Sequence, residues 1–177
     1  DKFPEAVPGM DQAYTSAVWA DTPRGEAAQG LPFLLSRGAD PEILEAVRIL
    51  ARDPVPSVRY LLTCELWRIS ESVPDDFWQL LQDITRQDKN AVVLQGVAES
   101  LWQVTGRHQD KATAILDALM PRVLDGPDHS ELARTFIALT IWLLIDQKHP
   151  WAVSLSARLL NEPGKYAKAL SRATKSA

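Results

Sequence analysis

The chain has 177 residues, of which 46% are hydrophobic and 24% are charged, and its formal net charge is −4. This length and composition are typical of one globular domain and exclude a disordered polypeptide. The single cysteine, Cys64, excludes an internal disulfide and a cysteine-based metal cluster, and it favours a reducing, cytoplasmic location. No run of about 18 apolar residues is present, so no membrane-spanning helix is expected.

The two ends of the chain differ in character from its middle. The chain begins at Asp1 rather than at methionine, which favours a segment of a larger multidomain protein. Residues 147–177 contain six lysine and arginine residues against one acidic residue, Glu162, whereas the rest of the chain is acidic. An acidic body argues against a nucleic-acid-binding platform.

Proline, glycine and aspartate divide the chain into helical segments. Asp40-Pro41 is typical of a helix start, because aspartate caps the free backbone amides and proline fits the first helical position. No segment alternates apolar and polar residues, so no sheet is predicted, and residues 1–20 show no clear pattern. Apolar residues at helical spacing predict helices over 23–37, 41–52, 57–70, 74–87, 90–105, 109–124, 129–146 and 151–161, with a final basic helix after Pro163-Gly164.

Three of these helices resemble one another. A shift of 35 residues places Trp67 over Trp102 together with four other apolar positions, and a further shift of 40 places Trp142 in the same register. Any two amphipathic helices can be aligned on their apolar residues, but a coincident tryptophan is harder to explain by chance. We therefore interpret the pattern as an internal repeat, in which stacked helix pairs bury a continuous core.

The turn before the first of these helices resembles that of a HEAT repeat. In that family an aspartate in the turn and an arginine six residues later form hydrogen bonds that stack into a ladder, and Asp53 and Arg59 match this motif. The second repeat has Asp88 but Leu94 at the arginine position. The third has Arg134, at a longer distance from its turn. The repeats are therefore divergent.

The resemblance implies an all-α fold, a HEAT-like α-solenoid of antiparallel helix pairs, forming one domain over 1–177. Its expected parts are a poorly defined start (1–20), a degenerate helix (21–37), three clear repeats (41–71, 74–106, 108–146) and a partial capping repeat with a basic tail (149–177). Such folds bind partners on their concave face, so the resemblance implies protein binding there rather than catalysis.

Few side chains suggest chemistry. The histidines, His108, His129 and His149, lie about 20 residues apart at predicted helix ends, without the spacing of a zinc site. Asp75-Asp76 begins a helix, where the helix dipole accounts for both carboxylates without a catalytic role. We therefore expect no metal site and no catalytic pair.

The remaining motif search gives no cofactor or nucleophile. Cys64 lies in an apolar helix with no basic neighbour in sequence, so a packed side chain is favoured over a reactive thiol. No glycine-rich phosphate-binding motif and no nucleophile-elbow motif occurs, and no cofactor is expected.

Two surfaces are candidates for contact with a partner. Residues 136–145 contain only one polar side chain, Thr140, so this helix is either enclosed by its neighbours or forms a dimer or interdomain interface. The basic tail places four cations along one helical face, which favours a solvated helix but also allows contact with an acidic partner: Lys165, Lys168, Arg172 and Lys175.

Three functions remain open at this point. A non-catalytic interaction or scaffold module is favoured by the repeat and by the absence of motifs. An enzyme resembling the alkylpurine DNA glycosylases would need a basic concave groove with aromatic residues and a carboxylate. A ligand-sensing segment beside a nucleotide-driven switch is a third alternative. We expect Trp67, Trp102 and Trp142 to be buried between repeats, whereas their exposure in a row would favour a binding groove.

Overall fold

The computed structural model describes residues 22–125 and 130–161, and within these ranges every regular element is a helix. This agrees with the predicted all-α class. The helices are α1 (Pro23–Leu35), α2 (Pro41–Leu50), α3 (Pro56–Glu65) with the 3₁₀ segment η3 (Leu66–Ile69), α4 (Pro74–Gln87), α5 (Ala91–Val104), α6 (Gln109–Asp125), α7 (Ser130–Ile145) and α8 (Pro150–Asn161).

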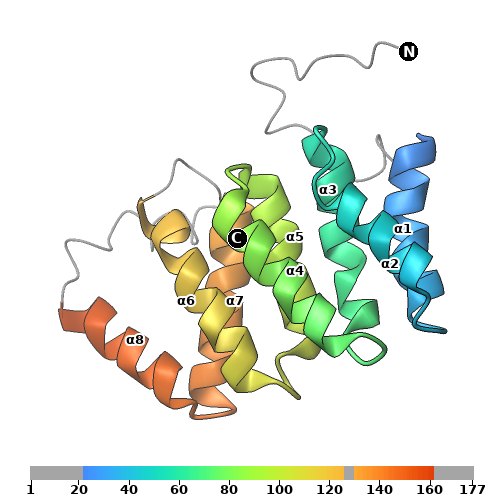
Figure 1. The fold of residues 1–177 in the computed structure, drawn as a ribbon. Helices are drawn as coiled ribbons and strands as arrows, with labels where there is room; N and C mark the ends of the chain where they lie inside the picture. Colours follow the sequence, from blue (N-terminus) through green and yellow to red (C-terminus); the bar gives the residue numbers. More distant parts are fainter. Residues whose placement is uncertain (1–21, 126–129, 162–177) are drawn as a thin grey trace.

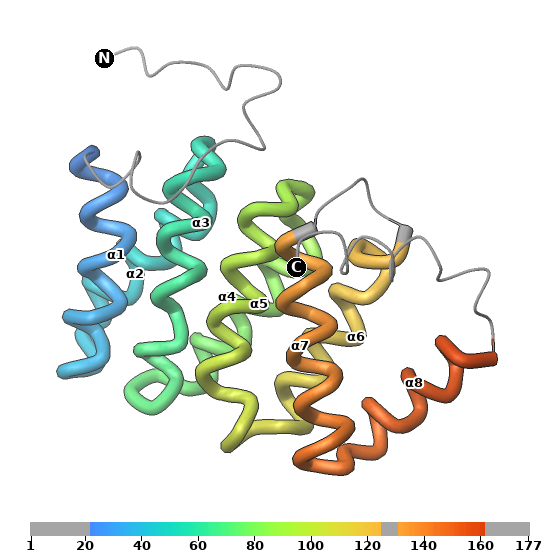
Figure 2. Tube along the Cα trace, turned by 180° about the vertical axis from the view of Figure 1, so that it is seen from behind, coloured from blue at the N-terminus to red at the C-terminus, as the bar shows by residue number. Residues whose placement is uncertain are grey.

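The helices form two layers (Figures 1 and 2). In the odd-helix layer, α1 packs on α3, α3 on α5 and α5 on α7. The even helices cover one side of this layer, with α4 packed on α6. Side chains link further members of the even layer, since Arg48 of α2 pairs with Asp76 of α4 at 2.6 Å and Trp151 of α8 donates to Asp117 of α6 at 3.1 Å.

The helix starts follow the sequence signals. Asp40 accepts hydrogen bonds from the amides of Glu42 and Ile43, and Asn90 caps α5 in the same way. The helices α2, α3, α4 and α8 each begin at a proline, whose missing N–H costs nothing at that position.

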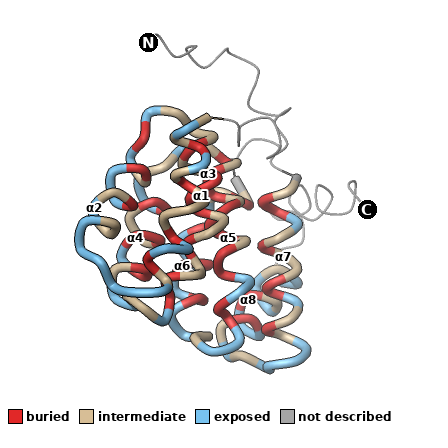
Figure 3. Tube along the Cα trace, turned by 90° about the vertical axis from the view of Figure 1, so that its right-hand side faces the viewer, coloured by how far each residue is buried: buried red, intermediate tan, exposed pale blue. Residues whose placement is uncertain are grey.

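The core lies between the two layers, as the burial colouring shows (Figure 3). Its largest fully buried side chains come from both layers, for example Leu62 and Leu101 of the odd layer and Phe77 and Leu116 of the even layer. Burying apolar surface from neighbouring helices in this way is the main source of stability in such an array.

One predicted helix ends differently from expectation. The segment 57–70 was predicted as one helix, but α3 ends at Glu65 and continues as the 3₁₀ segment η3. The hydroxyl of Ser100, on α5, accepts from the Trp67 amide at 3.2 Å and donates to the Thr63 carbonyl. These two groups would bond directly in an α-helix, so the inserted hydroxyl explains the change of helix type.

The helices α3 and α5 are in close contact at Gly96. A Cβ atom built there would be 2.1 Å from Thr63 Oγ1 and 3.1 Å from the Tyr60 carbonyl oxygen. A glycine is therefore required for the two helices to pack at this distance.

Candidate functional site

A row of large apolar side chains crosses the outer surface of the odd-helix layer. We call it the aromatic row and define it as Phe33, Trp67, Trp102 and Ile141, which lie in the C-terminal parts of α1, η3, α5 and α7. The Cys64 thiol donates to Glu99 at 3.1 Å, which places these two residues side by side. Trp67 lies one turn after Cys64, and Trp102 lies one turn after Glu99. The two tryptophans therefore lie on the same face of the odd-helix layer.

Much of the aromatic row is accessible to solvent. The exposed fractions are 41% for Phe33 and 48% for both Trp102 and Ile141, while Trp67 is half-buried. Leu34, the residue after Phe33 in α1, is also exposed, at 50%. Contiguous exposed apolar surface on a soluble protein commonly marks a binding site.

The expectation that all three tryptophans are buried is therefore wrong for Trp102. Trp67 and Trp142 are half-buried and pack against the core. In α7, the third of the helices aligned on their tryptophans, the observed register differs by one residue from the predicted register. Trp102 matches Ile141 in exposure, and Leu101 matches the buried Thr140. Trp142 instead lies beside Gly106, where a Cβ atom would be 3.9 Å from its ring.

The apolar helix over residues 136–145 is only partly enclosed. Phe136, Leu139 and Leu143 are buried, and the hydroxyl of Thr140 donates to the Phe136 carbonyl at 2.9 Å. In contrast, Ile141 and Ile145, the latter at 65% exposure, face solvent. The helix thus contributes both to the core and to the exposed surface of the odd-helix layer.

Two arginines lie over the rings at the α1 end of the aromatic row. The Arg37 guanidinium is 4.5 Å from the centre of the Phe33 ring. The Arg68 guanidinium is 4.7 Å from the Trp67 ring and 5.9 Å from Phe33, so it lies between two members of the row. Such cation–π contacts hold the guanidinium groups flat against the apolar surface. Sequence reasoning missed Phe33 and Arg37, because the glycine and proline in α1 obscured its periodicity.

Carboxylates neutralise the arginines of the odd helices. Arg68 pairs with Glu65, and Arg134 pairs with Glu131. Arg24 and Arg59 pair with Asp53 and Asp88, in the turns before α3 and α5. Arg37, immediately after α1, has no carboxylate partner among the described residues. Among the described residues of this face, Arg37 is therefore the arginine left to contact an anionic group.

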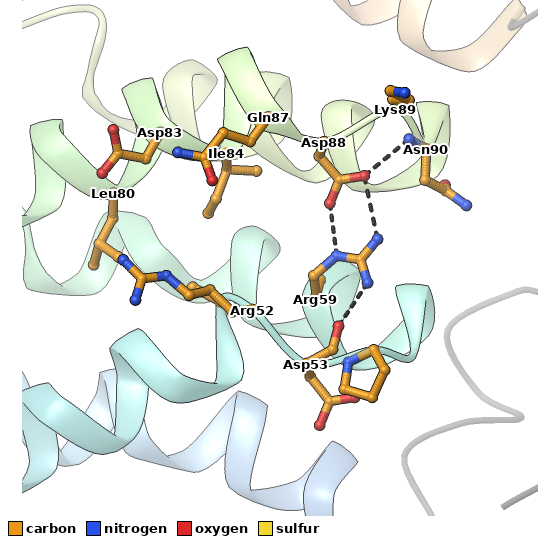
Figure 4. A pocket seen from close by; sticks show the side chains of 12 residues that line it. Arg52, Asp53, Arg59, Leu80, Asp83, Ile84, Gln87, Asp88, Lys89 and Asn90 are labelled. Atoms are coloured by element: carbon orange, nitrogen blue, oxygen red, sulfur yellow. Dashed lines mark hydrogen bonds and ion pairs between the residues drawn. The ribbon is translucent and has the colours of Figure 1, made fainter.

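The turns before α3 and α5 carry arginine–aspartate contacts (Figure 4). They are a modified form of the contacts that the HEAT resemblance predicted. Arg59 donates to the backbone carbonyl of Asp53 at 2.6 Å and pairs with the carboxylate of Asp88, in the following turn, at 2.6 Å. Arg24 pairs with the Asp53 carboxylate at 2.9 Å. In each pair the arginine and the aspartate are 29 residues apart in sequence, so the same contact occurs at two successive turns.

An open cavity of about 580 Å³ lies beside these turns. Its two buried carboxylates are already bonded: Asp53 accepts from the Val55 amide at 2.8 Å, and Asp88 from the Asn90 amide at 2.9 Å, in addition to their arginines. These groups therefore stabilise the turns and are not available to a ligand. Arg134, expected in the same register, instead pairs within α7 and is exposed.

Cys64 is unsuited to nucleophilic chemistry. Burial raises the pKa of its thiol, and the neighbouring Glu99 raises it further. Burial also raises the pKa of Tyr60, beside it. Both groups are neutral at physiological pH, so the thiol acts as a hydrogen-bond donor to Glu99.

His108, His149 and Asp76 have structural contacts. His149 accepts from the Trp151 amide at the start of α8, and His108 packs edge-on against Trp78 at 5.7 Å. Asp76 binds Arg48, which accounts for its carboxylate without catalysis. Within residues 22–125 and 130–161, no three His, Cys, Asp or Glu side chains are grouped to hold a metal ion.

Several predictions concern regions that the structure leaves undescribed. His129, the start of the chain (1–20) and the basic tail lie outside the described residues. In the described part, no helix combines the length and the apolar character needed to cross a bilayer. Comparison with known proteins gives no match: no protein-family model, no curated protein and no solved structure is significantly similar to this chain.

Proposed function

We propose that this chain is a HEAT-like α-solenoid that acts as a non-catalytic interaction or scaffold module, binding another protein on the odd-helix face. The solenoid is supported by the recurrence of equivalent parts. The helices α3 and α5 begin 35 residues apart, and the contacts Arg24–Asp53 and Arg59–Asp88 repeat with the same offset.

The observation that carries the binding proposal is the exposure of the aromatic row. The aromatic row crosses four helices, with Trp102 near its middle and Ile141 at its α7 end. About half of each of these two residues is accessible to solvent. Aromatic residues beside arginine are enriched at the energetic centres of protein interfaces. An isolated exposed side chain would need no such explanation, but a row in equivalent helices does.

The nucleic-acid enzyme alternative has less support from the same surface. A DNA-binding groove needs several cations free to contact phosphates, whereas the arginines of the odd helices are paired with carboxylates. Glu99, which precedes Trp102 by one turn, already accepts from Cys64 and from Gln95 at 2.8 Å. A ligand-sensing role has no specific observation in its favour.

The test compares capture of partners by three forms of the protein. Trp102→Ser removes the most exposed ring of the aromatic row, and Ile49→Ser removes an equally apolar side chain, 63% exposed, from α2 in the even layer. Extract from the source cells is passed over immobilised wild type and both variants, and bound proteins are identified by mass spectrometry. We expect at least one protein bound by wild type and Ile49→Ser to be lost with Trp102→Ser. Identical sets for all three forms would contradict the proposal.

A further inference from the structure

We infer that the occupant of the odd-helix face is a proline-rich segment in the polyproline II conformation, lying across the helices with an acidic residue over Arg37. This inference rests on the proposed function and specifies its partner chemistry. It is carried by three features of the aromatic row within the described part of the chain: its spacing, the exposed surface of Trp102, and the charge of Arg37, which has no described carboxylate partner.

The spacing favours one backbone conformation. The aromatic row contributes one side chain from each odd helix, and α1, α3, α5 and α7 are packed neighbours. Packed helices lie about 8–10 Å apart, so a ligand crossing them meets a new apolar side chain at about that interval. A polyproline II helix presents the same face every three residues, or about 9.3 Å.

Other backbone conformations match this interval less well. An extended strand repeats its face about every 6.7 Å, and three residues along it place the side chain on the opposite face. An α-helix returns to the same face after seven residues, about 10.5 Å. At an interval of about 9 Å, the middle of that range, the α-helix accumulates a mismatch of about 4.5 Å over the three intervals from α1 to α7, whereas the polyproline II helix accumulates about 1 Å.

The surface has the chemistry that proline rings prefer. Proline-rich segments bind grooves lined with aromatic side chains, because their preformed conformation loses little entropy on binding. Among the described residues neither a second ring nor a cation covers Trp102, so its indole face is open. Arg37 and Arg68 both lie over Phe33, and Arg68 also lies over Trp67. Trp102 is therefore the anchor.

The charge selects an acidic residue at one end of the segment. Arg37 lies over Phe33, at the α1 end of the aromatic row, and no described carboxylate neutralises it. A glutamate or aspartate one polyproline turn beyond the residue on Phe33 would reach this guanidinium. Arg68, in the middle of the row, is already paired with Glu65, so no second acidic position is expected there.

The experiment measures binding of defined peptides by fluorescence anisotropy. The probe is a fluorescein-labelled peptide of about 12 residues made of Pro-Pro-Ala triplets, long enough to cross the row. One version carries glutamate at its N-terminal end and a second version carries it at its C-terminal end. Both are needed because the peptide can run along the row from α1 to α7 or from α7 to α1. Matched controls replace glutamate by glutamine, or the prolines by alanine. A labelled single-stranded oligothymidylate tests nucleic acid.

The expected result has three parts. One of the two glutamate peptides binds, and the alanine peptide binds at least tenfold more weakly. Trp102→Ser weakens binding of that peptide about tenfold, whereas Ile49→Ser leaves it unchanged. Arg37→Gln weakens the glutamate peptide several-fold and leaves the glutamine peptide unaffected, which separates the charge contact from a general loss of structure.

The inference is overturned if the alanine peptide binds as well as the proline peptides, if Trp102→Ser has no effect on binding, or if oligothymidylate binds more tightly than any peptide. Failure of the peptides to bind also overturns it, but a Trp102-dependent partner in the capture experiment would then leave the proposed function intact. Loss of both results would refute the two together.

Discussion

Replacement of Gly96 by alanine tests whether the contact between α3 and α5 is as close as the structure shows. The new methyl group would lie 2.1 Å from Thr63 Oγ1 and 3.1 Å from both Thr63 Cβ and the Tyr60 carbonyl oxygen. The Thr63 hydroxyl cannot move away freely, because it donates to that carbonyl at 2.8 Å. Overpacking of this kind costs about 1–3 kcal/mol. Loss of the hydrogen bond adds about 1 kcal/mol.

Alanine is favoured over glycine in a helix by about 1 kcal/mol, which offsets part of this cost. We therefore expect Gly96→Ala to lower the free energy of unfolding by about 2 kcal/mol, or the Tm by about 4–8 °C for a chain of this size. Gly30, inside α1, is the matched control, since a Cβ atom there would meet nothing within 4 Å. Gly30→Ala should raise stability by about 0.5–1 kcal/mol.

Urea unfolding followed by far-ultraviolet circular dichroism measures both variants. Adding Thr63→Ala to Gly96→Ala removes the closest atom and should recover part of the loss. If Gly96→Ala is as stable as the wild type while Gly30→Ala is stabilised as expected, α3 and α5 do not approach as closely as described.

Three further predictions address the polar contacts. Arg59→Met leaves the buried Asp88 carboxylate without its arginine and should cost about 3 kcal/mol in urea unfolding. Arg134→Met breaks an exposed pair and should cost less than about 1 kcal/mol, and equal losses for the two variants would contradict the assigned burial. Ser100→Ala removes the hydroxyl inserted between two backbone groups and should cost about 1–3 kcal/mol in the same assay, and a neutral effect would show that the insertion is not stabilising. The pKa of Cys64 is raised in the folded state, so on raising the pH the unfolded chain loses its thiol proton first, and the free energy of unfolding should fall above the ordinary thiol pKa. Between about pH 8.5 and 10 this fall should be less steep in Cys64→Ala than in the wild type. An unchanged slope would refute the assignment.

The sequence predicted the helices well because their signals are local. Prolines and capping residues such as Asp40 and Asn90 act within one turn, and the observed helices begin within two residues of the predicted starts. The end of α3 was not predictable in this way. Its cause is the hydroxyl of Ser100, 33 residues beyond Trp67, and no local pattern in either helix indicates that the two will meet.

The candidate site was only partly predictable, for a related reason. Tryptophan at matching positions identified the helices that resemble one another, but burial depends on the register between layers. A shift of one residue turns a helical position by about 100°, which is enough to place Trp142 half-buried against the core while Ile141 takes the exposed position. The pairing of Arg59 with Asp88 rather than with the Asp53 carboxylate likewise depends on how successive turns stack.

The arginine–aspartate contacts also make the coupling along the chain unequal. In the repeat array proposed above, stability is approximately the sum of the stabilities of the single units and of their junctions with neighbouring units. Arg24 and Arg59 reinforce the first two junctions, from α1 to the α2–α3 turn and from α3 to the α4–α5 turn, whereas position 94, next in this series, is leucine. Cooperative unfolding should therefore divide near the boundary between α5 and α7. Amide protons of α7 and α8 should exchange with solvent before those of α3, so the molecule would open from its C-terminal side while the arginine-linked units stay folded.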